Sequence, residues 1–199
     1  LCANKTLVSA GAIGYNTIYN IKLGISALDY SYYVKPGVLT PTNVSVTDTY
    51  PAGAEFVSAV VLENGVPVSP QPAITHSGNS FTIGIPNYTV YANGLDWQTQ
   101  QYSVNVTLKY NTSNFSAGQS VTNQAAVTYT PLGGSPITIN NGQTTNCGAA
   151  DLIETHTRTA PIPNGNLSKS NDVSNAYPAQ QFGYSIGLIN TGNTPLENV

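Results

Sequence analysis

Charge is what this sequence has least of. Asp, Glu, Lys and Arg make up only 8% of its 199 residues, against about 25% in an ordinary globular domain. Six Lys and Arg are set against nine Asp and Glu, which gives a formal net charge of -3. No positive field is available to hold a phosphate backbone, so we expect no nucleic-acid partner. The surface must be hydrated by something other than charged side chains.

Long apolar runs are also absent. No stretch of eighteen or more apolar residues occurs, so we expect no transmembrane helix. No basic segment followed by an apolar one opens the chain, which starts at Leu1 instead of Met. We interpret the chain as a mature form or an excised unit.

Residues suited to catalysis are scarce. His76 and His156 are the only histidines, and no His/Cys spacing fits zinc, so we expect neither a metal site nor a cofactor. No glycine-rich phosphate loop, GxSxG elbow or HExxH motif is present. We therefore expect no catalysis on an external substrate, and a secreted carbohydrate-active enzyme is only a distant alternative.

Two cysteines, Cys2 and Cys147, lie near the two ends of the first long segment. An even pair in a chain rich in Asn and Thr indicates one disulfide in an oxidising compartment. Two unpaired buried thiols are the alternative.

Short segments of alternating polarity, separated by Gly, Pro and Asn, dominate the chain and predict β-strands. They are 17–25, 44–49, 55–62, 81–85, 102–110 and 125–129. Strands at this spacing are typical of an antiparallel β-sandwich, which we assign to residues 1–160. Residues 161–166 contain two prolines and an Asn-Gly pair and are predicted to be a linker.

The segment 167–199 repeats the start of the chain at a period of about 164 residues. Lys169 corresponds to Lys5, and the strand around Tyr184 corresponds to the strand around Tyr19. The first copy carries an insertion around 27–34. The tail is therefore predicted to be the first two strands of a second sandwich.

Such a hairpin cannot bury its apolar face alone. The missing strands come either from adjoining repeats of the same chain or from another copy by strand addition. Both arrangements give a head-to-tail series of units, and a disordered tail is the alternative. The residues expected at the contact between units are Lys169, Phe182, Tyr184, Ile186 and Leu188.

Residues 43–57 (NVSVTDTYPAGAEFV) resemble the signature of DUF11-type surface repeats of bacteria and archaea. Residues 190–195 (NTGNTP) and 123–127 (NQAAV) are similar to further parts of that pattern. The resemblance implies Ig-like sandwich modules along surface stalks, adhesins and extracellular filaments. Some relatives polymerise by donor-strand complementation. A fold alone does not establish a function.

Lys5, Asp48 and Asn123 are the candidates for an internal isopeptide bond. That reaction needs a buried lysine with a lowered pKa, beside a carboxylic acid that burial keeps protonated. Related surface sandwiches use triads of Lys, Asn and Asp or Glu. The alternative is a surface lysine, a turn-capping Asp48 and an Asn123 that bonds the backbone.

Seven Asn-x-Ser/Thr sequons are candidates for N-linked glycans, which would supply the missing hydration. They begin at Asn4, Asn43, Asn87, Asn105, Asn111, Asn114 and Asn166.

The sequence as a whole predicts a structural subunit of an extracellular filament or stalk at a cell surface. The alternative is an adhesin module whose loops, 30–33 or 88–97, bind a glycan or a host protein. Tyr30, Tyr32 and Tyr33 could stack on a sugar, but such tyrosines are more often half-buried sheet residues or interface anchors, and we favour an interface between units.

Overall fold

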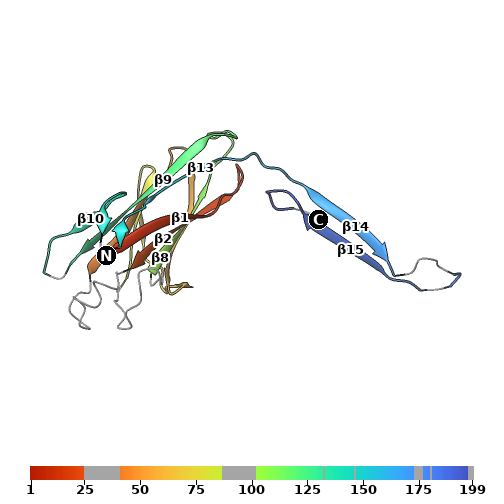
Figure 1. The fold of residues 1–199 in the computed structure, drawn as a ribbon, viewed down its shortest axis with the longest axis horizontal. Helices are drawn as coiled ribbons and strands as arrows, with labels where there is room; N and C mark the ends of the chain where they lie inside the picture. The colour runs from red at the N-terminus through yellow and green to blue at the C-terminus, as the bar shows by residue number, and fades with distance from the viewer. Residues whose placement is uncertain are drawn as a thin grey trace.

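The computed structural model describes residues 1–24, 41–86, 102–131, 133–145, 147–172, 177–179 and 181–196. All regular structure within these ranges is β-strand. Most strands form two antiparallel sheets that pack face to face, and a separate hairpin stands apart at the C-terminal end (Figure 1). The predicted all-β, Ig-like sandwich is confirmed. The expected insertion around residues 27–34 lies outside the described residues.

The first sheet has five strands in the order β1-β2-β8-β4-β5. They are β1 (Cys2–Ser9), β2 (Asn16–Gly24), β8 (Tyr102–Lys109), β4 (Glu55–Glu63) and β5 (Val66–Pro67). β1 forms the edge, and β2 pairs with β8 from Asn16 opposite Lys109 to Leu23 opposite Tyr102. The N-terminal hairpin therefore closes one side of this sheet.

The second sheet has the order β10-β9-β3-β7-β6, and β13 also pairs with β9. These strands are β10 (Ile137–Ile139), β9 (Ser120–Thr130), β3 (Thr42–Thr49), β7 (Ser80–Gly84), β6 (Ile74–Ser77) and β13 (Ile153–Thr157). β11 (Thr144–Thr145) and β12 (Gly148–Ala149) form a small sheet of their own.

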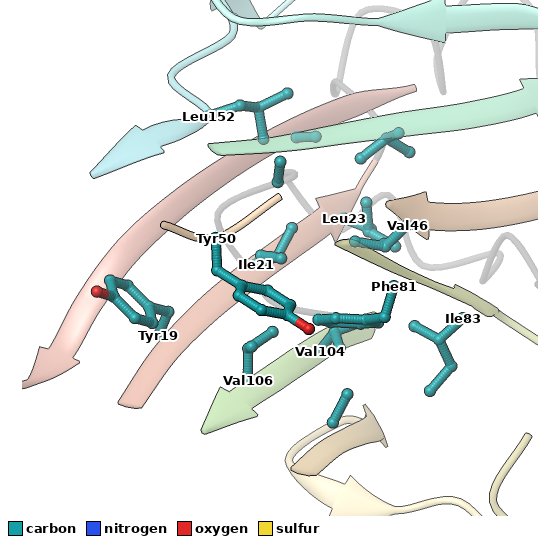
Figure 2. Close-up of a cluster of buried hydrophobic side chains, with 14 of the residues drawn as sticks. Tyr19, Ile21, Leu23, Val46, Tyr50, Phe81, Ile83, Val104, Val106 and Leu152 are labelled. Carbon is teal, nitrogen blue, oxygen red and sulfur yellow. The ribbon is translucent and has the colours of Figure 1, made fainter. Parts of the chain in front are cut away.

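The core lies between the two sheets, because alternate side chains of each strand point inward. Tyr19, Ile21 and Leu23 of β2 are fully buried, and face residues such as Val46 and Phe81 of the other sheet (Figure 2). Burying a side chain of this size stabilises the fold by about 1.5–3 kcal/mol. The period-two pattern of the sequence is thus the pattern of the core.

A two-residue turn, Asn64-Gly65, joins β4 to β5. Glu63 pairs with Val66 across it, and both turn residues have positive φ, 50° and 80°. Positive φ at both positions defines the type I′ turn, which Asn-Gly favours.

The C-terminal hairpin consists of β14 (Gly165–Asn171) and β15 (Tyr184–Asn190). β14 begins at Gly165, so it includes two residues that the sequence assigned to the linker. The Asn193 side chain accepts a hydrogen bond from the Ile162 backbone and donates one to the Ala160 carbonyl. A side chain at Gly192 would collide with the Ile162 carbonyl, because an added Cβ would lie 2.0 Å from its oxygen. The end of the linker is therefore fastened to the hairpin.

Candidate functional site

Lys5 enters the core from the edge strand of the first sheet. It lies opposite Ile21, and its backbone N–H donates to the Asp151 carbonyl at 2.7 Å. Its Nζ lies 5.1 Å from the centre of the Tyr19 ring, and the residue is 1% exposed. An ordinary lysine keeps its ammonium in water, so this burial requires a partner inside the sandwich.

Asp48 and Asn123 come from two neighbouring strands of the second sheet. Asp48 on β3 pairs with Ala125 of β9, and Asn123 lies two residues before Ala125 on the same inward face. Both residues are fully buried. The triad predicted from sequence therefore brings together one residue from the first sheet and two from the second.

Lys5 Nζ donates a hydrogen bond to Asp48 Oδ2 between the sheets. Asp48 Oδ1 and both polar atoms of the Asn123 carboxamide make no hydrogen bond of good geometry, although Asn123 lies close enough to Asp48 to act on its pKa. A buried polar group left unsatisfied costs about 1–3 kcal/mol. Buried side-chain amides in native proteins are normally hydrogen-bonded, so the Asn123 carboxamide beside Asp48 calls for an explanation.

Burial sets the protonation of the pair. It lowers the pKa of Lys5 below its usual value, although the nearby Asp48 carboxylate acts to raise it. Burial raises the pKa of Asp48, although Lys5 and the adjacent Asn123 act to lower it. Both shifts favour a neutral amine and a protonated acid, which are the forms that attack on a carboxamide needs.

The arrangement has the chemistry for an amide exchange. The neutral Lys5 amine would attack Cγ of Asn123 while the Asp48 acid polarises the carbonyl oxygen. In that reaction the Nζ–Cγ bond would form, the Cγ–Nδ2 bond would break, and Asp48 would carry the amine proton to the departing nitrogen, which would leave as ammonia. No oxidant or metal takes part in this balance.

The disulfide between Cys2 and Cys147 closes the sandwich at the N-terminal end of β1. Their Cα atoms lie 5.9 Å apart, and they are 145 residues apart in the chain. The alternative of two unpaired thiols does not apply to this structure.

A second buried polar cluster, which the sequence did not reveal, surrounds Arg158. The guanidinium donates to Thr17 Oγ1 at 2.9 Å and to the Gly11 carbonyl at 2.5 Å, and it lies 4.3 Å from the Tyr110 ring centre. The Tyr110 and Tyr19 hydroxyls are 2.7 Å apart. Burial and the Arg158 charge lower the pKa of His156 in the same cluster. These contacts fix the residues just before the linker to the body of the sandwich.

The sequons differ in their accessibility. Asn43, Asn114 and Asn166 are exposed, and Asn111 and Asn4 are partly buried. Asn105 lies within β8, and its side chain accepts a hydrogen bond from Asn20 at 2.6 Å. Asn87 and the candidate loops 30–33 and 88–97 lie outside the described residues.

The hairpin residues expected at a contact between units are exposed. Tyr184, Ile186 and Leu188 expose 53%, 70% and 43% of their surface, and Phe182 is 38% exposed. Lys169 is exposed as well, with its Nζ 4.0 Å from the Tyr184 ring centre.

Within the described parts of the chain, no group of three or more His, Cys, Asp or Glu is arranged to hold a metal ion. The same residues form no helix of the length and apolarity that a membrane crossing requires.

No protein-family model matches the sequence, and no curated protein does. Solved structures do match. The full-length major pilin SpaD from Corynebacterium diphtheriae superposes with a TM-score of 0.54 at 10% identity, over 84% of this chain and 41% of that chain. Its fold is the Ig-like β-sandwich of surface pilins. BcpA, the major pilin subunit of Bacillus cereus, gives a TM-score of 0.53 at 13% identity, over 97% of this chain and 55% of that chain.

At these identities the likeness establishes the fold alone, and the chain spans about half the length of these two pilins. The DUF11-type resemblance is not matched by a family model and stays an expectation.

Proposed function

We propose that this chain is a structural unit of an extracellular filament or stalk at a cell surface, in which sandwich units follow one another head to tail. The observation that carries the proposal is the β14–β15 hairpin, which is separate from the two large sheets and whose apolar side chains are exposed. Two strands alone are marginal in water. The apolar face of the hairpin must therefore be covered by further strands of a sandwich. Each contact between a hairpin and such a sandwich adds one unit to the filament.

The join between units is β-strand complementation. β15 would pair with a strand of the adjoining unit, and its apolar face would enter that unit's core. The two neighbours of the same fold are both described as major pilins, and that description supports a fibrous role for this chain.

Tension along such a filament acts on each unit at its two ends. Two covalent cross-links would carry this force in place of the hydrogen bonds between strands. The Cys2–Cys147 disulfide joins residues near both ends of the sandwich. An isopeptide bond between Lys5 and Asn123, formed with Asp48 as the acid, would add a second tie between the two sheets. We assign this bond as the function of the buried triad.

We also propose N-linked glycans at the exposed sequons, because so few charged groups hydrate this surface. Mass spectrometry of proteolytic peptides from native material should find glycans at two or more of Asn43, Asn114 and Asn166. Asn105 should be unmodified, since it is only partly exposed and its side chain accepts a hydrogen bond from Asn20. Glycan-free peptides at all three exposed sites would refute this assignment.

Electron microscopy of native material tests the filament proposal. Gold-labelled antibodies against the sandwich should decorate threads at repeated intervals along their length. An adhesin would be labelled at the cell surface but not along threads. The purified chain would also bind to a glycan array. That pair of results would replace the filament with the adhesin.

A further inference from the structure

We propose that the β14–β15 hairpin is completed by an adjoining sandwich that lacks a first hairpin of its own, and that Lys169 is welded there to an asparagine by a second isopeptide bond. This inference rests on the proposed head-to-tail function. It adds the nature of the acceptor and the residue that makes the join covalent.

The two hairpins share one register. Lys169 lies opposite Ile186 in the C-terminal hairpin, as Lys5 lies opposite Ile21 in the N-terminal one. Leu167 pairs with Leu188 where Ala3 pairs with Leu23, and Asn171 pairs with Tyr184 where Leu7 pairs with Tyr19. Because side chains alternate across a strand, an equal register places Lys169 on the same face as the three apolar residues of β15.

The lysine also has the same neighbour in both hairpins. Lys5 Nζ lies over the ring of Tyr19, and Lys169 Nζ lies over the ring of Tyr184, at 5.1 Å and 4.0 Å from the ring centres. A lysine on the apolar face of a strand is costly once that face is covered, unless a partner or a reaction removes its charge. In the first sandwich Asp48 and Asn123 fill that role.

Burial separates the two copies. Tyr19, Ile21 and Leu23 are 0% exposed, whereas Tyr184, Ile186 and Leu188 are 53%, 70% and 43% exposed. Contiguous apolar surface of this kind marks an interaction site. The face that the first sandwich buries is therefore the face that the hairpin presents to a partner.

A second complete copy of this sandwich does not offer the required place. In a complete copy, β2 already pairs with β8 along its length, so the hairpin cannot take that position. β1, which lies beyond β2, is held in place by the Cys2–Cys147 disulfide. Asp48 of that copy already holds Lys5. The acceptor must present an unpaired strand like β8, an acid at the place of Asp48 and an asparagine at the place of Asn123.

The chemistry repeats that of the first site. The neutral Lys169 amine attacks the carboxamide carbon of the acceptor asparagine, and the new N–C bond replaces the bond to the amide nitrogen. The acid passes the amine proton to that nitrogen, which leaves as ammonia.

A tandem protein supplies such an acceptor. The full 199-residue chain is extended after Val199 by a second copy of residues 45–160, in which Cys147→Ser avoids a free thiol. Its intact mass should fall short by about 34 Da, for two molecules of ammonia, and by about 17 Da with Lys169→Ala. Asn123→Ala in the appended copy should likewise reduce the deficit to one ammonia. Lys22→Ala is the control, because Lys22 is a partly buried lysine of β2 that neither bond uses, and it should leave the deficit at two.

Two results overturn the inference. One is a tandem whose appended unit is folded, by near-ultraviolet circular dichroism, yet lacks only one ammonia. The other is covalent dimers of the unextended chain on a denaturing gel, which would make a second copy the acceptor.

Native material gives a reading that does not depend on folding of the appended unit. Peptide mapping should find Lys169 joined to an asparagine-containing peptide, and recovery of Lys169 only in linear peptides would also contradict the inference. If no cross-link is found at Lys169 while the Lys5–Asn123 bond and the threads are present, the inference is wrong but the proposed function is not contradicted. Loss of the threads counts against that function itself.

Discussion

A single molecule pulled between residues 1 and 160 should lengthen by about 500 Å only when both covalent ties are absent, since an extended chain gains about 3.5 Å per residue. With the disulfide intact, force passes from Cys2 to Cys147 and bypasses the chain between them, whose ends have a sequence separation of 145. After reduction, the Lys5–Asn123 bond should limit the gain to about 150 Å. Atomic force microscopy of the reduced wild type and of Asn123→Ala makes the comparison.

Asn105→Ala is the matched control for the pulling experiment, because it removes an asparagine of β8 that the bond does not use. The reduced control should stop at the same short length as the reduced wild type. If the reduced wild type extends as far as Asn123→Ala, no covalent tie joins the two sheets.

Asn123→Ala should lower the free energy of unfolding of the reduced protein by about 4–5 kcal/mol. The loss is that of a covalent loop of more than a hundred residues, whose closure restricts the unfolded chain. The sign of this effect is diagnostic. Without the bond, the same substitution removes two unsatisfied buried atoms and should stabilise the fold or leave it unchanged.

Urea unfolding under reducing conditions measures the difference. Asn105→Ala should cost only about 1 kcal/mol, for one lost hydrogen bond with Asn20. An Asn123→Ala protein at least as stable as the wild type would remove the isopeptide bond from the account.

Much of the fold follows from local pattern. Alternation on β2 and the Asn64-Gly65 turn predict the strands and the tight connection, because inward and outward positions differ in polarity along each strand. The polar residues that interrupt this alternation, Asp48 after Val46 and Asn123 after Val121, mark the buried site.

Other features depend on packing between distant elements. The Arg158 cluster joins residues more than a hundred positions apart. The sequence around Arg158 does not predict that its side chain is buried. The contact of Lys5 with Asp48 depends on how the two sheets face each other, which strand periodicity does not determine. The exposed face of the hairpin was predictable, because the repeat identifies its inward residues.

The intact mass of the purified chain tests the central claim most directly. After deglycosylation, the wild type and Lys22→Ala should each lack about 17 Da, the mass of one ammonia, beyond the disulfide hydrogens. Lys5→Ala, Asp48→Ala and Asn123→Ala should each have their full mass. A wild type of full mass would contradict the covalent tie between the sheets.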